Sequence, residues 1–151
     1  MKLAMIASSG GHWEELLCLK QLTQKYTAFY VTEEGGQAQD SKVEPLYLVP
    51  QINRQEKGFL LHFIKLFAKA WKIMGKEHPD AVVTTGALIA FPFCVIAKLK
   101  GKKVIYIESF ARVRQKSLTG KLVYPFADLF IVQWEEMTKL YPKAKFMGGI
   151  F

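Results

Sequence analysis

Five consecutive residues near the start of the chain, Ser8-Ser9-Gly10-Gly11-His12, have the types and spacing to bind an anion and move a proton. They follow the apolar run Leu3-Ala4-Met5-Ile6-Ala7, which has the length of a buried strand. Glycines at such a strand end let the backbone approach a ligand closely, and the N–H groups of the next helix favour a negative charge. His12 lies in the same turn and titrates near neutral pH. The segment predicts a phosphate site beside a candidate base. The plainer alternative is that the glycines serve only tight packing of strand and helix.

Two further segments place polar residues at the ends of apolar runs. Thr84-Thr85-Gly86 is either a second backbone cradle or a plain turn. Glu108-Ser109-Phe110-Ala111-Arg112 follows the run Val104-Ile105-Tyr106-Ile107. Glu108 could accept hydroxyl groups of a polar ligand while Arg112 holds phosphate oxygens, or Glu108 could form a local ion pair with the basic residues that follow it. Because binding sites of parallel sheets lie outside the carboxyl ends of the strands, we expect all three segments to meet in one cleft.

These segments are connected by alternating short apolar runs and helical patterns. Strands are predicted near 2–7, 27–32, 46–49, 81–84, 103–108 and 128–132, with another at 145–147. Helices are predicted near 12–24, 58–77, 87–100, 117–125 and 135–141, and residues 33–44 and 50–57 read as surface loops. The alternation indicates an α/β fold, a Rossmann-like parallel sheet with helices on both faces. With 151 residues and no internal repeat, the range 1–151 is expected to form a single domain.

Composition narrows the class of function. The net charge of +8 favours anionic partners. Cys18 and Cys94 lie in apolar helical stretches and are expected to be buried, reduced thiols. His62 and His78 look structural, and no His/Cys/Asp cluster has the spacing of metal ligands. The G-x-G-x-x-G fingerprint is missing, which disfavours a nicotinamide-dependent enzyme. The first residues do not read as a signal peptide, and no apolar stretch is long enough for a transmembrane helix, so a soluble or peripheral protein is expected.

The segment from Phe59 to Lys76 contains no acidic residue and combines lysines with a broad apolar face. One interpretation is an ordinary helix with a solvated lysine side. The other is contact with an anionic membrane surface, for which the candidate residues are Phe63, Lys65, Phe67, Lys69, Trp71 and Lys72. The helix near 87–100 has almost no polar face, so we expect something outside the chain to cover part of it. Nucleic acid is disfavoured as a partner, because the lysines alternate with apolar residues rather than with stacking aromatics.

Taken together, several blocks of the sequence resemble a known family. They are Ala7-Ser8-Ser9-Gly10-Gly11-His12, Thr85-Gly86, Tyr106-Ile107-Glu108-Ser109-Phe110-Ala111-Arg112-Val113, Ser117-Leu118-Thr119-Gly120-Lys121-Leu122, and Ala127-Asp128 through Gln133-Trp134. They look like the PssD/CpsF type of polysaccharide biosynthesis protein, the bacterial counterpart of the membrane subunit of the dolichol-pathway N-acetylglucosaminyltransferase. That family is similar to the N-terminal half of MurG-like GT-B glycosyltransferases.

The resemblance implies an acceptor-binding, membrane-associated subunit of a two-component glycosyltransferase in capsular or exopolysaccharide biosynthesis. It would transfer a sugar from a UDP-sugar to a polyprenyl-diphosphate-linked saccharide at the cytoplasmic face of the cell membrane. A PssE/CpsG-like partner would carry the nucleotide-sugar site, and no cofactor or metal is implied. Carried over to this sequence, the catalytic base is His12 and the substrate-binding residues are Ser9, Gly10, Gly11, Thr85, Gly86, Glu108, Ser109 and Arg112. The alternatives are a non-catalytic membrane anchor that activates a partner enzyme and a free-standing nucleotide-binding domain.

Overall fold

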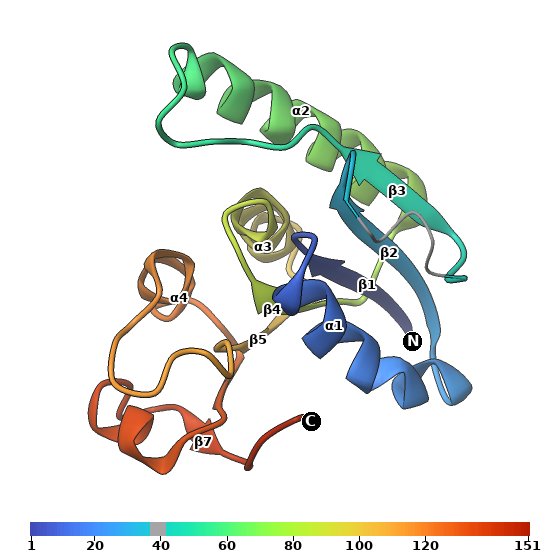
Figure 1. Ribbon diagram of the computed structural model, residues 1–151. Coiled ribbons are helices and arrows are strands. Elements are labelled where there is room, and N and C mark those ends of the chain that lie inside the picture. Colours follow the sequence, from blue (N-terminus) through green and yellow to red (C-terminus); the bar gives the residue numbers. More distant parts are fainter. Residues whose placement is uncertain (37–41) are drawn as a thin grey trace.

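The computed structural model describes residues 1–36 and 42–151, so part of the predicted loop 33–44 lies outside the described residues. The described strands form one parallel sheet in the order β3-β2-β1-β4-β5-β6-β7 (Figure 1). Their bounds are β1 Lys2–Ala7, β2 Thr27–Glu33, β3 Leu46–Val49, β4 Ala81–Gly86, β5 Lys103–Ile107, β6 Leu129–Val132 and β7 Lys145–Phe146. The predicted Rossmann-like sheet is confirmed.

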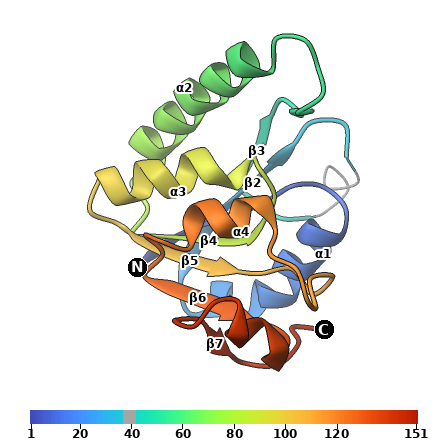
Figure 2. The same ribbon diagram turned by 90° about the vertical axis from the view of Figure 1, so that its left-hand side faces the viewer.

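Helices cover both faces of the sheet. Their bounds are α1 Gly11–Cys18, α2 Phe59–Glu77, α3 Ala90–Leu99 and α4 Leu118–Val123, with 3-10 helices η1 at Leu19–Gln24 and η3 at Glu135–Lys139. Helices α2, α3 and α4 lie on one face and α1 lies on the other (Figure 2). The predicted helix at 12–24 therefore changes to 3-10 geometry after Cys18, and the one at 135–141 is a 3-10 helix.

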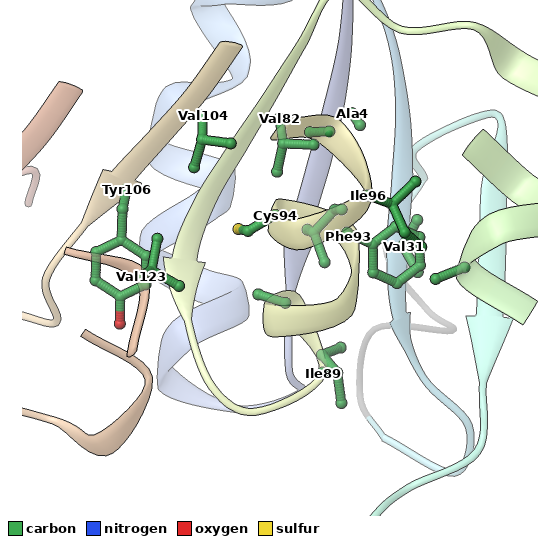
Figure 3. Packing of buried hydrophobic residues seen from close by; sticks show 14 of the residues in the cluster. Ala4, Val31, Val82, Ile89, Phe93, Cys94, Ile96, Val104, Tyr106 and Val123 are labelled. Atoms are coloured by element: carbon green, nitrogen blue, oxygen red, sulfur yellow. The ribbon is translucent and has the colours of Figure 1, made fainter. Parts of the chain in front are cut away.

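The strands bury alternate residues on opposite faces, as a period of two requires. Ala4 and Ile6 of β1 pack in the cluster that α3 covers, whereas Leu3 and Met5 pack with α1. Figure 3 shows the first cluster, in which side chains of α3 such as Phe93 lie against the sheet. Because both faces are covered, strands such as β5 and β6 are near-continuous apolar runs.

Helix α3 is covered by the protein itself, which corrects the expectation of an external cover. Its residues Ala90, Pro92, Phe93, Cys94, Ile96 and Ala97 are buried. Helix α2 lies along it, and the rings of Phe63 and Phe67 are each 6.3 Å from the ring of Phe91. Burial raises the pKa of Cys94 to about 12, in line with an inert thiol. Cys18, in contrast, is exposed, so that prediction was wrong.

The packing on α3 divides the apolar face of α2 into two parts. Phe63 and Phe67 are partly buried and pack against the core, so they are less exposed than the prediction of membrane contact assumed. Lys69 is partly covered and lies 3.7 Å from Glu34. The solvent side carries a row of large apolar residues, Leu60, Leu61, Ile64 and Trp71, each more than 50% exposed, which we call the outer stripe.

Lysines border the outer stripe. Lys65 and Lys72 are exposed beside it, and Lys100 places its Nζ 4.7 Å from the centre of the Trp71 ring. No helix within residues 1–36 and 42–151 combines the length and hydropathy needed to span a bilayer.

Candidate functional site

A cavity of about 480 Å³ lies at the carboxyl ends of the strands, where the sequence predicted a cleft. Its wall includes Ser9 and His12 after β1, Leu88 after β4, and Ser109 and Arg112 after β5. The connections that follow these three strands therefore meet in one cavity, but Thr84, Thr85, Gly86 and Glu108 themselves are not part of its wall. Further lining residues are Ser8, Glu33, Gln51, Ile52, Arg54, Ala87, Ala111, Ser117, Leu118 and Thr119.

The start of α1 has free backbone donors next to this cavity, whose wall includes Ser8, Ser9 and His12 but not the predicted site residues Gly10 and Gly11. Gly10 is the N-cap residue with φ +83° and ψ −143°, a conformation that only glycine adopts without strain. Its carbonyl accepts from Trp13 N at 2.9 Å and Glu14 N at 3.1 Å. Within the described parts of the chain, the N–H groups of Gly11 and His12 bond to no acceptor. A Cβ at Gly11 would enter open space, so the backbone here is accessible to an anion.

His12 is held by the end of β4. Its Nδ1 lies 2.9 Å from the carbonyl oxygen of Thr85, and the Thr85 hydroxyl donates to the His12 carbonyl at 2.6 Å. Because a carbonyl oxygen only accepts, Nδ1 carries the hydrogen, and the lone pair of the neutral ring is on Nε2. A Cβ at Gly86, which has φ +115°, would lie 3.4 Å from the His12 ring. Thr85 and Gly86 thus position His12, which corrects their prediction as a second ligand-binding loop.

Glu108 is a structural carboxylate, contrary to the prediction that it binds ligand. It is 1% exposed and accepts hydrogen bonds from Ser117 N at 3.2 Å, Ser117 Oγ at 3.0 Å and the Tyr141 hydroxyl at 2.9 Å. Burial and then the Glu108 charge raise the pKa of Tyr141, which keeps its hydroxyl protonated as a donor. No ion pair joins Glu108 to the neighbouring basic residues within the described ranges. Glu108 therefore anchors the connection 109–117 that carries Arg112.

Glu15 anchors the other end of the same connection, and the sequence analysis missed it. It is 3% exposed and accepts from Ser109 Oγ at 2.9 Å, Phe110 N at 3.2 Å and Gln133 Nε2 at 2.9 Å. Ser109 lines the cavity, but its hydroxyl hydrogen is donated to Glu15 rather than to a ligand. Glu15 follows His12 by three residues and so lies near it on the helix, a spacing that could have indicated it. Helix α1 thus joins the ends of β4 and β5 through two side chains.

Two charged residues of the cavity wall were also missed, Glu33 and Arg54. Glu33 ends β2 rather than lying in a loop, and it accepts from Ser9 N at 3.4 Å and Ser9 Oγ at 3.3 Å. Burial raises the pKa of Glu33, although the bonds from Ser9 and the charge of His12 oppose that shift. With Arg54 and Arg112 the wall holds more cations than carboxylates, which suits an anionic ligand. Within the described residues, no group of three His, Cys, Asp or Glu side chains is placed to hold a metal ion.

Comparison with solved structures supports the fold assignment. MurG of Acinetobacter baumannii aligns with a TM-score of 0.75 and 22% identity over 89% of this chain and 42% of MurG. The UDP-bound MnaA of Staphylococcus aureus aligns with a TM-score of 0.77 and 15% identity over 99% of this chain and 45% of MnaA. The chain thus spans less than half the length of these proteins. At such identities the likeness establishes the fold alone, that of GT-B glycosyltransferases and epimerases.

Comparison with sequences establishes the family. The subunit ALG14 of the UDP-N-acetylglucosamine transferase of Mus musculus is 30% identical over 99% of this chain and 83% of its own length. The ALG14 subunit of Yarrowia lipolytica is 31% identical over 97% of this chain and 80% of its own length. The family model described as "Oligosaccharide biosynthesis protein Alg14 like" matches residues 3–150. The chain therefore belongs to the Alg14-like family of oligosaccharide biosynthesis proteins.

Proposed function

We propose that this chain is the acceptor-binding, membrane-associated subunit of a two-component glycosyltransferase of the PssD/CpsF type. The reaction would transfer a sugar from a UDP-sugar to a polyprenyl-diphosphate-linked saccharide during synthesis of a capsular or exopolysaccharide. One observation carries the proposal: a cavity at the start of α1 combines His12 with Arg112 and with free backbone N–H groups. A candidate base and an anion-binding wall face the same space.

In the proposed mechanism His12 accepts the proton of the acceptor hydroxyl on Nε2 as the oxygen attacks the anomeric carbon and UDP leaves with inversion. The bond from Nδ1 to the Thr85 carbonyl supports this role, because it fixes the tautomer and stabilises the imidazolium that forms. The acceptor diphosphate would bind Arg112, Ser9 and the N–H groups of Gly11 and His12.

A second chain would supply the donor site. The similarity to ALG14 of Mus musculus, which is named a subunit of a UDP-N-acetylglucosamine transferase, supports a role in which residues 1–151 act as one acceptor-binding unit. A PssE/CpsG-like subunit would then bind the UDP-sugar and close the cleft from the other side. This chain by itself is expected to be inactive.

Membrane association is the second part of the proposal. The outer stripe of α2 exposes four large apolar side chains on one side of a helix, with Lys65 and Lys72 beside them. Such a surface suits the interface of an anionic bilayer, where Trp and Leu enter the headgroup region and lysines meet the lipid charge. The contact would be peripheral, at the cytoplasmic face of the cell membrane.

Replacing His12 with Ala in the complex with the partner chain tests the catalytic role. Loss of a general base should lower kcat by about 100- to 10,000-fold, with assembly of the complex and vesicle binding unchanged. His62→Ala removes a histidine outside the cavity wall and is the matched control. Unchanged turnover of His12→Ala would instead support the non-catalytic anchor and activator, which needs only the outer stripe.

A further inference from the structure

The cavity at the start of α1 continues into a second depression. The connection between β3 and α2 lines this groove of about 550 Å³ with Gln51, Ile52, Asn53, Arg54, Gln55 and Glu56. Gln51, Ile52 and Arg54 belong to both walls, so the two spaces meet there. Figure 2 shows this connection at the same end of the sheet as the turn from β1 to α1.

The residues that line the groove lie shortly before the outer stripe of α2 in the chain. Arg54 precedes Leu60 by six residues, a span of at most about 20 Å of chain. Leu60 and Leu61 are 69% and 56% exposed at the first turn of the helix. The connection between β3 and α2 thus lines the cavity and the groove and then enters the helix that carries the outer stripe.

Arg54 is the basic residue of this groove, and it also faces the cavity that Arg112 lines from the opposite connection. Within residues 1–36 and 42–151, neither guanidinium is ion-paired. A planar guanidinium binds phosphate oxygens in pairs, and two such groups in the wall of one cavity suit the two phosphates of a diphosphate.

We propose that Arg54 binds the diphosphate of the lipid-linked acceptor together with Arg112, and that the groove holds the part of the acceptor between diphosphate and bilayer. The inference rests on the proposed function and adds the entry route of the substrate. The lipid would reach the cavity from the outer stripe, past Arg54, with its diphosphate stopping between the two arginines.

The first test is kinetic, with the complex of this chain and its partner. Arg54→Gln should raise the KM for the polyprenyl-diphosphate acceptor on the order of 10- to 100-fold, with kcat and the KM for the UDP-sugar unchanged. Lys57→Gln, a neighbouring exposed cation outside both walls, should change neither constant. A raised KM for the UDP-sugar would assign Arg54 to the donor diphosphate and overturn the proposal, as would a normal acceptor KM.

The second test needs no turnover. Neutral phosphatidylcholine vesicles are prepared with polyprenyl diphosphate or with the uncharged polyprenol, and binding of the chain to each is compared. Arg54→Gln should lose most of the extra binding that the diphosphate gives, whereas Lys57→Gln should keep it. Arg54→Gln could lose this diphosphate-dependent binding while the complex of wild-type chain and partner transfers no sugar. In that case the proposed function is wrong, but the assignment of Arg54 to a diphosphate site stands. Equal extra binding by both variants overturns the Arg54 site.

Discussion

Gly120 of α4 is a position where a single methyl group should damage the site. A Cβ there would lie 2.6 Å from the Tyr141 hydroxyl, 2.8 Å from Ser117 Oγ, and closer still to Glu108 Oε2. The backbone of Gly120 is helical, so lack of space rather than an unusual φ excludes a side chain. Gly120→Ala should therefore push apart the hydrogen bonds that hold Glu108 and, with it, the connection carrying Arg112.

The expected cost follows from three opposing contributions. Forcing an extra methyl group into a packed site costs about 1–3 kcal/mol. Disturbing hydrogen bonds to a buried carboxylate costs about 1–3 kcal/mol more. Alanine gains back about 1 kcal/mol of helix propensity over glycine. A net loss of about 3 kcal/mol in the free energy of unfolding remains, a large fraction of the stability of a domain of this size.

Urea unfolding of the two variants Gly120→Ala and Gly75→Ala measures this cost against an internal control. Gly75 is also helical, in α2, but a Cβ there meets nothing within 4 Å. Gly75→Ala should stabilise the protein by about 0.5–1 kcal/mol, as alanine does in an open helical site. If Gly120→Ala proves as stable as Gly75→Ala, the packing of α4 on the Glu108 network is not what positions this connection.

Two further predictions concern the membrane surface and the pH dependence of stability. The double variant Lys65→Glu and Lys72→Glu should weaken binding to anionic vesicles by at least about 2 kcal/mol, roughly 30-fold. Lys25→Glu, on the opposite face, should leave this binding unchanged. If both variants sediment equally with the vesicles, the outer stripe is not the membrane-binding surface. Burial raises the pKa of Glu33 above its ordinary value of 4.5, so its ionised form opposes folding once the pH exceeds the unfolded value. Glu33→Gln should accordingly raise Tm relative to wild type at pH 8 and should not raise it at a pH below 4.5. The same Tm difference at both pH values would show that the ionised Glu33 carboxylate does not destabilise the fold.

The strands and their common edge could be predicted because they depend on local patterns. Runs such as Val104-Ile105-Tyr106-Ile107 have the length and composition of strands buried on both faces. The alternation of strands and helices along the chain then predicts that the strands are parallel. Once the strands are parallel, the segments that follow β1, β4 and β5 must lie at one edge. His12 and Arg112 could therefore be assigned to one cavity from the sequence by itself.

The role of each carboxylate was decided by residues distant in the chain. Glu108 looked free to bind a ligand, but Ser117 and Tyr141 bring their donors to it only when α4 and η3 have packed. Glu15 looked like an ordinary helix residue, and it is buried because the end of β5 supplies donors to it from 94 residues away. A sequence does not indicate which buried charge will find such partners, because desolvation and hydrogen bonding are properties of the assembled site.

The same limit applies to α2 and to Arg54. Helical periodicity indicated an apolar face wide enough for two surfaces, and only the position of α3 determined that Phe63 packs inside while Leu60 and Trp71 remain outside. Arg54 reaches the cavity because the sheet order places β2 beside β1 and β3 beside β2, an order that local patterns do not specify. The sequence by itself determined the parallel sheet and the glycine turn that starts α1, since both follow from short-range backbone preferences. The tertiary structure decided which side chains face the cavity, the solvent or the core, because that depends on contacts between segments far apart in the chain.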